Sequence, residues 1–127
     1  MREIVLIDDD SVINFLHKEL IAIASPDTVV HEFQSSKNAF SWLQNKLQES
    51  NEKSSTIFLD INMPEMNGFE FLDALDEVIK GKEVNHYKIV MVSSSLNDRD
   101  RERALSYKMV GDYLEKPLTL EYLSALS

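Results

Sequence analysis

Carboxylate, hydroxyl and ammonium side chains stand at the ends of four predicted strands of the chain. In chain order these groups are Asp8, Asp9 and Asp10, then Asp60, then Ser93, Ser94 and Ser95, and finally Lys116. Carboxylates that lie close together repel each other, and one tends to take up a proton unless a cation lies between them. Oxygen ligands of this kind suit a hard divalent cation, above all Mg²⁺.

Together these groups supply the parts of a phosphoryl-transfer site: a carboxylate nucleophile, a metal ion and donors that neutralise charge. A lysine provides a point charge for a phosphoryl oxygen, and a serine hydroxyl provides one more donor. The chain has no cysteine, and its histidines, His17, His31 and His86, are scattered away from acids at useful spacing. We therefore expect no zinc site, and we expect the histidines to be surface or strand residues.

Each of these residues also has an ordinary structural interpretation. Asp10 is a candidate for the start of a helix, where the helix dipole favours negative charge. Asp60 is compatible with a turn before Pro64, and Lys116 with a plain surface lysine. The chemical interpretation is preferred because all four groups lie at the ends of successive predicted strands.

Apolar runs and amphipathic segments alternate five times, which predicts an α/β fold with a five-stranded parallel sheet and helices on both faces. The expected strands lie at residues 4–7, 28–33, 55–59, 88–92 and 111–114, and the fourth helix at residues 98–109. Ligands of such sheets bind outside the carboxyl ends of the strands. The acidic, hydroxyl and lysine groups meet if the sheet order brings strands one, three, four and five together.

The first predicted helix has Ser11 as its N-cap residue. Its apolar residues recur at helical spacing and form one stripe. The stripe consists of Val12, Ile13, Leu16, Leu20 and Ile23. We expect the helix to end at Ser25 and Pro26.

Length and composition indicate one domain over residues 1–127. Lysine and arginine total 13 and aspartate and glutamate total 22, which gives a net charge of −9. This charge disfavours sequence-independent binding to nucleic acid and docking on an anionic membrane surface. The apolar runs are too short to span a bilayer, and the lack of cysteine fits a reducing cytosol. We therefore expect a cytoplasmic protein without a direct nucleic-acid or membrane partner.

Four segments in order resemble the receiver domain of two-component response regulators, and the resemblance covers essentially the whole chain. They are Ile7-Asp8-Asp9-Asp10, Asp60-Ile61-Asn62-Met63-Pro64-Glu65-Met66-Asn67-Gly68, Met91-Val92-Ser93-Ser94 and Tyr113-Leu114-Glu115-Lys116-Pro117. The second segment is similar to the family's Asp-x-x-Met-Pro-x-Met-Asp/Asn-Gly pattern. The resemblance implies a flavodoxin-like fold of the single-domain, chemotaxis-regulator type, and a signalling role without enzymatic turnover.

The same resemblance assigns roles at the acidic site. It implies that Asp60 takes a phosphoryl group from a histidine of a sensor histidine kinase or of a histidine phosphotransfer protein. It implies that Asp8 and Asp9 hold Mg²⁺ or another divalent cation. Asp60 itself and the main-chain carbonyl of Asn62 are implied as its further ligands.

The remaining roles concern phosphoryl binding, switching and docking. The resemblance implies that Ser93 and Lys116 bind the phosphoryl group and that the Lys116–Pro117 bond is cis. It implies that Tyr113 turns inward when Ser93 moves, which reshapes the face of the fourth helix, fifth strand and fifth helix for a downstream protein target. Phe15 lies beside the aspartates on the first helix, which in the family engages a helical phosphotransfer partner. It is either an anchor for that partner or a residue at the edge of the apolar stripe.

A rival interpretation comes from the haloacid-dehalogenase-type phosphatases, whose Asp-x-Asp-x-Thr/Val signature fits residues 8–12. Asp8 is then the nucleophile and Asp10 the acid/base of a turnover enzyme. The chain is short for that fold, the acidic motif expected after the lysine is missing, and the segment from Asp60 to Gly68 has no role in it. A degenerate receiver that only binds proteins is a further alternative, and the retention of all five site positions opposes it.

Overall fold

Strands and helices alternate along the chain, as the sequence predicts. The computed structural model describes residues 2–48, 54–82, 84 and 86–126. Its elements are β1 (Arg2–Ile7), α1 (Ser11–Ala24), β2 (Val29–Phe33), α2 (Ser36–Leu47), β3 (Ser54–Asp60), α3 (Gly68–Ile79), β4 (Tyr87–Ser93), α4 (Asp98–Leu105), β5 (Val110–Glu115) and α5 (Leu120–Leu126). The strands form one parallel sheet in the order β2-β1-β3-β4-β5. The predicted α/β fold is confirmed, and β1, β3, β4 and β5 are indeed neighbours.

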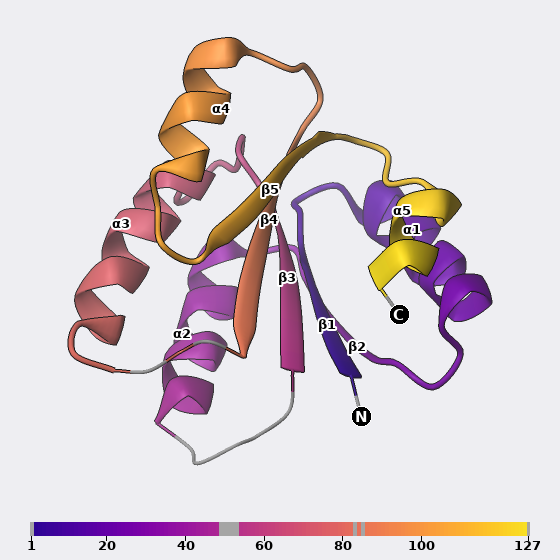
Figure 1. Cartoon of the computed structure of the whole chain (residues 1–127), viewed down its shortest axis with the longest axis horizontal. Helices are drawn as coiled ribbons and strands as arrows, with labels where there is room; N and C mark the ends of the chain where they lie inside the picture. Colours follow the sequence, from indigo (N-terminus) through magenta and orange to yellow (C-terminus); the bar gives the residue numbers. More distant parts are fainter. Residues whose placement is uncertain (1, 49–53, 83, 85, 127) are drawn as a thin grey trace.

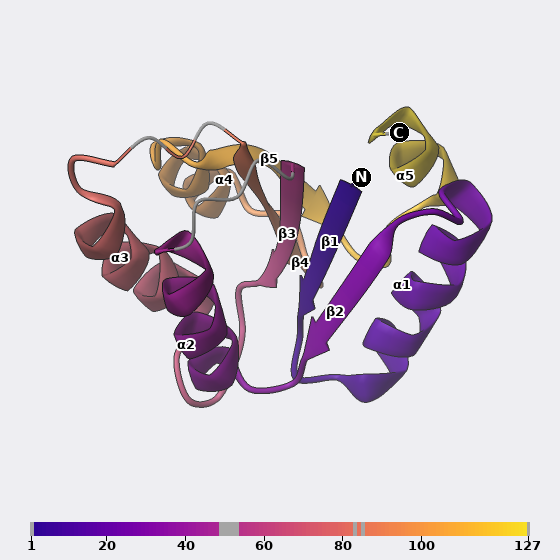
Figure 2. The same cartoon turned by 90° about the horizontal axis from the view of Figure 1, so that it is seen from below.

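Helices cover both faces of the sheet (Figure 1). Helices α1 and α5 pack on one face, and α2, α3 and α4 on the other, as the view from below also shows (Figure 2). Alternate residues of a strand point to opposite faces, so β1 places Val5 in one core cluster and Leu6 in the other. Because both of their faces are buried, the central strands β1, β3 and β4 contain continuous apolar runs, whereas the edge strands β2 and β5 include polar and exposed residues. Within the described residues, no helix combines the length and apolar character needed to cross a membrane.

Helix α4 is shorter than predicted. It ends at Leu105, whereas the sequence predicts helix as far as Met109. The hydroxyl of Ser106 donates to the carbonyl oxygen of Arg103 at 2.5 Å, a local bond that competes with continued helix. The hydroxyl of Tyr107 then donates to Asp73 of α3 at 2.5 Å, which fixes the turn that follows.

The predicted apolar stripe of α1 is not its buried face. Val12 and Ile23 are 72% and 66% exposed. The buried residues of this helix are Asn14, His17 and Ile21. The prediction was wrong because it assumed that apolar side chains pack inward, whereas the two polar side chains bind backbone groups of neighbouring loops. His17 is therefore a buried residue and not the surface residue that we expected.

A buried carboxylate joins three strands and α2 at the end of the sheet where β1 begins. Glu3 accepts hydrogen bonds from Ser55 Oγ at 2.8 Å and from Lys46 Nζ at 3.0 Å, and His31 Nε2 lies 3.1 Å away. Burial raises the pKa of Glu3, but these three partners outweigh it and hold the pKa below its usual value. The carboxylate therefore stays charged inside the fold, paired with a lysine and with a histidine that the sequence analysis left unpaired.

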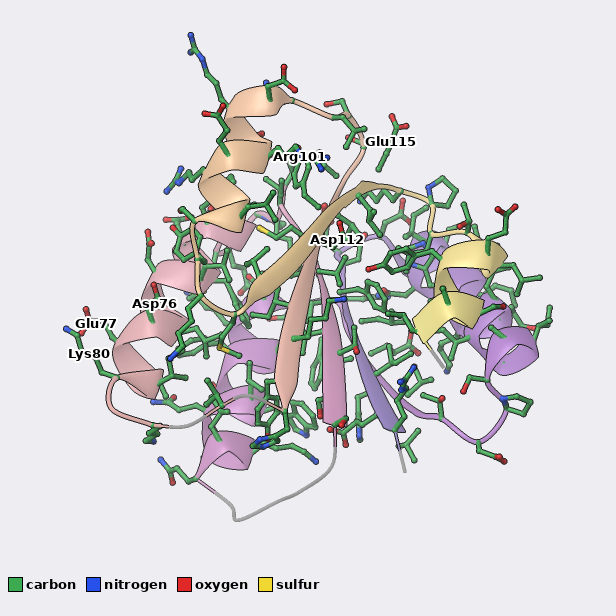
Figure 3. The ribbon with its side chains drawn as sticks, in the orientation of Figure 1. Asp76, Glu77, Lys80, Arg101, Asp112 and Glu115 are labelled. Atoms are coloured by element: carbon green, nitrogen blue, oxygen red, sulfur yellow. The ribbon has the colours of Figure 1, made fainter. Side chains whose placement is uncertain are left out.

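Replacing Lys46 by methionine is expected to destabilise the fold. The change leaves the buried Glu3 carboxylate without its cation, and a hydrogen bond to a charged group of this kind contributes about 2 kcal/mol. Lys80→Met is the matched control, because Lys80 and its partner Glu77 are both exposed at the outer end of α3 (Figure 3). Urea unfolding measures both, and equal losses of unfolding free energy would contradict this account of Glu3.

Candidate functional site

Three carboxylates and one ammonium group meet at the carboxyl edge of the sheet. One oxygen each of Asp8, Asp9 and Asp60 can be chosen so that all lie within 4.8 Å of one another. Lys116 Nζ lies 2.9 Å from Asp8 Oδ2 and 3.2 Å from Asp60 Oδ1. The structure therefore brings together residues that lie up to 108 positions apart in the chain. The cause is the sheet order, because the ends of parallel neighbouring strands share one edge.

The turn between β1 and α1 is fixed by its own aspartates. Asp8 Oδ1 accepts the backbone N–H of Asp10 at 2.9 Å. Asp10 Oδ1 accepts the N–H groups of Val12 and Ile13 at 2.9 and 3.3 Å, so it caps α1. The N-cap residue is thus Asp10 and not Ser11 as predicted, and the ordinary interpretation of Asp10 is confirmed. Its carboxylate is engaged in capping, which disfavours an acid/base role of the phosphatase type.

A glycine sets how closely α3 approaches Asp60. The Gly68 N–H donates to the carbonyl oxygen of Ile61 at 2.8 Å, directly after the Asp60 strand end. A Cβ atom on Gly68 would stand 2.9 Å from the carbonyl oxygen of Asp60 and 2.7 Å from Met91 Cε. Contacts this short force the backbone to shift, so the last position of the resembling segment carries no side chain for a steric reason.

The electrostatics of the site are dominated by burial and by carboxylate repulsion. Burial and the neighbouring Asp8 raise the pKa of Asp60 from its usual 3.8 to about 6, against the opposing effects of Lys116 and the Asn62 backbone N–H. Burial lowers the pKa of Lys116, but the hydrogen bond and charge of Asp8, with a further effect of Asp60, raise it overall. Lys116 is therefore charged, and Asp60 is mostly ionised above neutral pH. The Asn62 carbonyl stays a predicted metal ligand.

The raised pKa of Asp60 predicts a pH dependence of stability when divalent cations are removed. Its folded-state pKa lies above its unfolded-state value, so the protonated form favours the fold, and this stability is lost as the pH rises from about 4 through about 6. Asp60→Asn is therefore expected to be more stable than wild type by about 3 kcal/mol at about pH 7.5, and nearly equal to it at about pH 4. Urea unfolding in the presence of a chelator tests this, and a stability gain that is independent of pH would contradict it.

The donor set fits a hard divalent cation. Asp60 Oδ1 is buried, and its one close polar contact among the residues that the structure describes is the ion pair with Lys116 Nζ at 3.2 Å. Three carboxylates face a single ammonium, so the site carries excess negative charge. Oxygen ligands and negative charge are what Mg²⁺ prefers in proteins.

The structure places the remaining predicted site residues around this cluster. Ser93 ends β4 beside Asp60, but its hydroxyl donates to the carbonyl oxygen of Ser95 at 2.8 Å. Tyr113 is buried, and its hydroxyl has no partner among the described residues. The ring is thus already inside the fold, deeper than a half-buried aromatic on an edge strand. The peptide bond before Pro117 is cis, as the resemblance implies.

Two residues of α1 that contact the site loops escaped the sequence analysis. Asn14 Nδ2 donates to the carbonyl oxygens of Asp8 at 2.9 Å and of Phe33 at 3.5 Å. His17 Nε2 accepts the backbone N–H of Leu118 at 3.0 Å. Their three-residue spacing, which puts two polar side chains on one face of the helix, was the available signal.

Comparisons with known proteins agree with this geometry. The family model described as response regulator receiver domain matches residues 4–126. A two-component response regulator from Cytophaga hutchinsonii is 31% identical with a TM-score of 0.83, and the match covers 99% of this chain and 93% of that one. A response regulator receiver protein from Dyadobacter fermentans is 26% identical with a TM-score of 0.82, covering 99% and 94%. The Vibrio cholerae chemotaxis protein CheY4, at 21% identity, a TM-score of 0.74 and coverage of 99% and 95%, shares the fold. No curated protein matches the chain.

Proposed function

The chain belongs to the response regulator receiver domains of two-component systems, and from this premise we propose that it is a phosphoacceptor that takes a phosphoryl group onto Asp60. The observation that carries the proposal is the Lys116 ammonium held between Asp8 and Asp60 in a cluster of three carboxylates. The donor of the phosphoryl group is a phosphohistidine of a sensor histidine kinase or a histidine phosphotransfer protein. The role is signalling in the cytoplasm, without turnover of a substrate.

In the proposed reaction an ionised oxygen of Asp60 attacks the phosphorus of the phosphohistidine. A phosphorus–oxygen bond forms, the phosphorus–nitrogen bond breaks, and the leaving imidazole nitrogen keeps the electron pair and takes up a proton. Lys116 pairs with a phosphoryl oxygen and offsets its charge. Asp8, Asp9, Asp60 and the Asn62 carbonyl would hold Mg²⁺, which neutralises charge on the transferring group.

The output of the proposed switch depends on Ser93. A phosphoryl group on Asp60 adds charge and strong acceptor oxygens, which compete with the Ser95 carbonyl for the Ser93 hydroxyl. Movement of Ser93 changes the surroundings of the buried Tyr113 ring and the adjoining face of α4, β5 and α5. Phosphorylation then shifts the equilibrium between two conformations of this face, and a downstream protein target binds one of them better than the other.

The outer face of α1 is the proposed docking surface for the phosphohistidine partner. Phe15 is 65% exposed, and Val12 and Leu16 extend the apolar surface beside it at the start of the helix. An exposed apolar patch of this kind marks an interaction site. Its first turn adjoins Asp8 and Asp9, so a helical partner seated there brings its histidine toward Asp60.

Phe15→Ala is expected to slow transfer from a phosphorylated histidine phosphotransfer protein of the same organism by about 10-fold, as for an aromatic anchor in an interface. Transfer from acetyl phosphate, which needs no docking, is expected to stay unchanged. Ile23→Ala is the control, because Ile23 is equally exposed but lies about 12 Å further along the helix. Equal slowing with both donors would contradict a docking role.

The experiment that tests the proposed function is intact-mass spectrometry after incubation with acetyl phosphate, with and without Mg²⁺. We expect one phosphoryl adduct that depends on Mg²⁺, and a weaker adduct in Asp8→Asn because metal binding is impaired. Continuous release of phosphate without an accumulating adduct would favour the interpretation of the chain as a haloacid-dehalogenase-type phosphatase. No adduct in any sample would favour a module that only binds proteins.

A further inference from the structure

The inner face of α1 holds a buried histidine that the proposed reaction does not use. His17 is 2% exposed, and it lies one turn from Asn14 on the face that packs against the sheet. Both side chains bind backbone groups of the loops that carry site residues: Asn14 binds the Asp8 loop, and His17 binds the segment after Lys116. Helix α1 therefore devotes two of its three buried positions to holding the site loops.

The hydrogen bond defines the state of the imidazole ring. The Leu118 N–H donates to His17 Nε2 at 3.0 Å, so this nitrogen carries a free electron pair and the neutral ring carries its proton on Nδ1. Burial lowers the pKa of His17 to about 4, with Asp8 opposing and Lys116 adding to the effect. The ring therefore stays neutral, and the acceptor is present, at physiological pH.

The position of Leu118 makes this bond important for Lys116. Pro117 has no backbone N–H, so Leu118 carries the first donor that can anchor the chain after Lys116. On the other side, the Lys116 N–H donates to the carbonyl oxygen of Ser93 at 2.9 Å. These two bonds hold the short segment from both ends, one against β4 and one against α1. Between them the Lys116 side chain reaches both Asp8 and Asp60.

We propose that His17 is a positioning residue for phosphoryl transfer, which holds the backbone that carries Lys116 and thereby sets the place of the ammonium group between the two aspartates. The inference rests on the proposed function, because it concerns the same reaction. Without the acceptor, the buried Leu118 N–H loses its partner and the segment shifts to find another. Such a shift moves the Lys116 ammonium group, and a displaced charged group slows a reaction that depends on alignment.

The test compares His17→Leu, which removes the acceptor, with His17→Gln, whose amide oxygen can accept the same N–H. The rate of Asp60 phosphorylation by acetyl phosphate is measured at saturating Mg²⁺. His17→Leu is expected to be about 10-fold slower than wild type, and His17→Gln to recover most of that loss. Ile21→Val and Ile21→Ala are the controls, because Ile21 is equally buried on the same helix face and belongs to the same core cluster as Leu118, but its side chain offers no hydrogen-bond acceptor to the Leu118 N–H. Of the two Ile21 variants, the one whose melting temperature falls as far as that of His17→Leu serves as the control. Its phosphorylation rate is expected to match that of wild type.

A second measurement separates positioning from general loosening of the fold. His17→Leu is combined with Lys116→Met, and the rates of both single variants and of the double variant are compared. If His17 acts through Lys116, its substitution has no further effect once the lysine is gone. Equal slowing by the Ile21 control, no recovery in His17→Gln, or the same slowing with and without Lys116 would each overturn the proposal. Wild type that forms no Asp60-dependent adduct would instead overturn the proposed function.

Discussion

Asp60→Asn is expected to abolish the phosphoryl adduct that wild type forms with acetyl phosphate and Mg²⁺. The amide has no ionised oxygen with which to attack phosphorus, while its size and burial match those of the carboxylate. The rate is expected to fall by about 1000-fold or more, below what intact-mass spectrometry detects, because no other group of the cluster stands in for the nucleophile. Loss of activity should come with equal or greater stability, since the amide removes a buried carboxylate that repels Asp8.

The control for this prediction is an aspartate outside the site. Asp73 lies on α3 and is exposed, where it contacts Tyr107 and Arg103. Asp73→Asn should therefore form the adduct at the wild-type rate. An adduct of unchanged yield in Asp60→Asn would assign the acceptor to another residue, with Asp8 the first to examine.

Lys116→Met is expected to slow phosphorylation by about 100- to 1000-fold, the usual cost of removing one charge-stabilising donor from a transition state. The same change should leave Mg²⁺ binding as tight or make it tighter, because the ammonium now pairs with Asp8 and competes with a cation for that carboxylate. Phosphorylation rates and a Mg²⁺ titration, followed by tryptophan fluorescence or by melting temperature, measure the two effects separately.

Lys108→Met is the control, because Lys108 is exposed and precedes the start of β5, whereas Asp8, Asp9 and Asp60 lie at the carboxyl ends of the strands. Its rate and Mg²⁺ affinity should both match wild type. If Lys116→Met loses Mg²⁺ binding together with its rate, the lysine organises the metal ligands and does not act mainly on the phosphoryl group.

The site could be predicted from the sequence because parallel topology turns chain order into spatial position. Asp8, Asp60 and Lys116 each lie at or next to the end of a predicted strand, and the edge at which parallel strands end brings them together whatever their separation in the chain. The fold followed from the same alternation of strands and helices. The predicted N-cap residue of α1 was wrong by one position. Asp10 and Ser11 are both good capping residues, and only the folded backbone determines which of them caps the helix.

The buried polar contacts could not be predicted, because they depend on partners that tertiary structure supplies. Periodicity analysis assumes that the apolar side of a helix packs inward, so it assigned the exposed Val12 to the core and His17 to the surface. Only the folded chain shows that Leu118 offers an N–H to His17. The pairing of Glu3 with Lys46 likewise spans 43 positions and leaves no local pattern.

The most direct test of the central claim is to locate the phosphorylated residue chemically. Borohydride reduces an acyl phosphate of aspartate to homoserine, and peptide mass spectrometry then identifies the reduced position in wild-type protein treated with acetyl phosphate and Mg²⁺. We expect homoserine at position 60, in amounts that depend on Mg²⁺. Homoserine at position 8, with residue 60 unchanged, would contradict the account and favour the phosphatase chemistry instead.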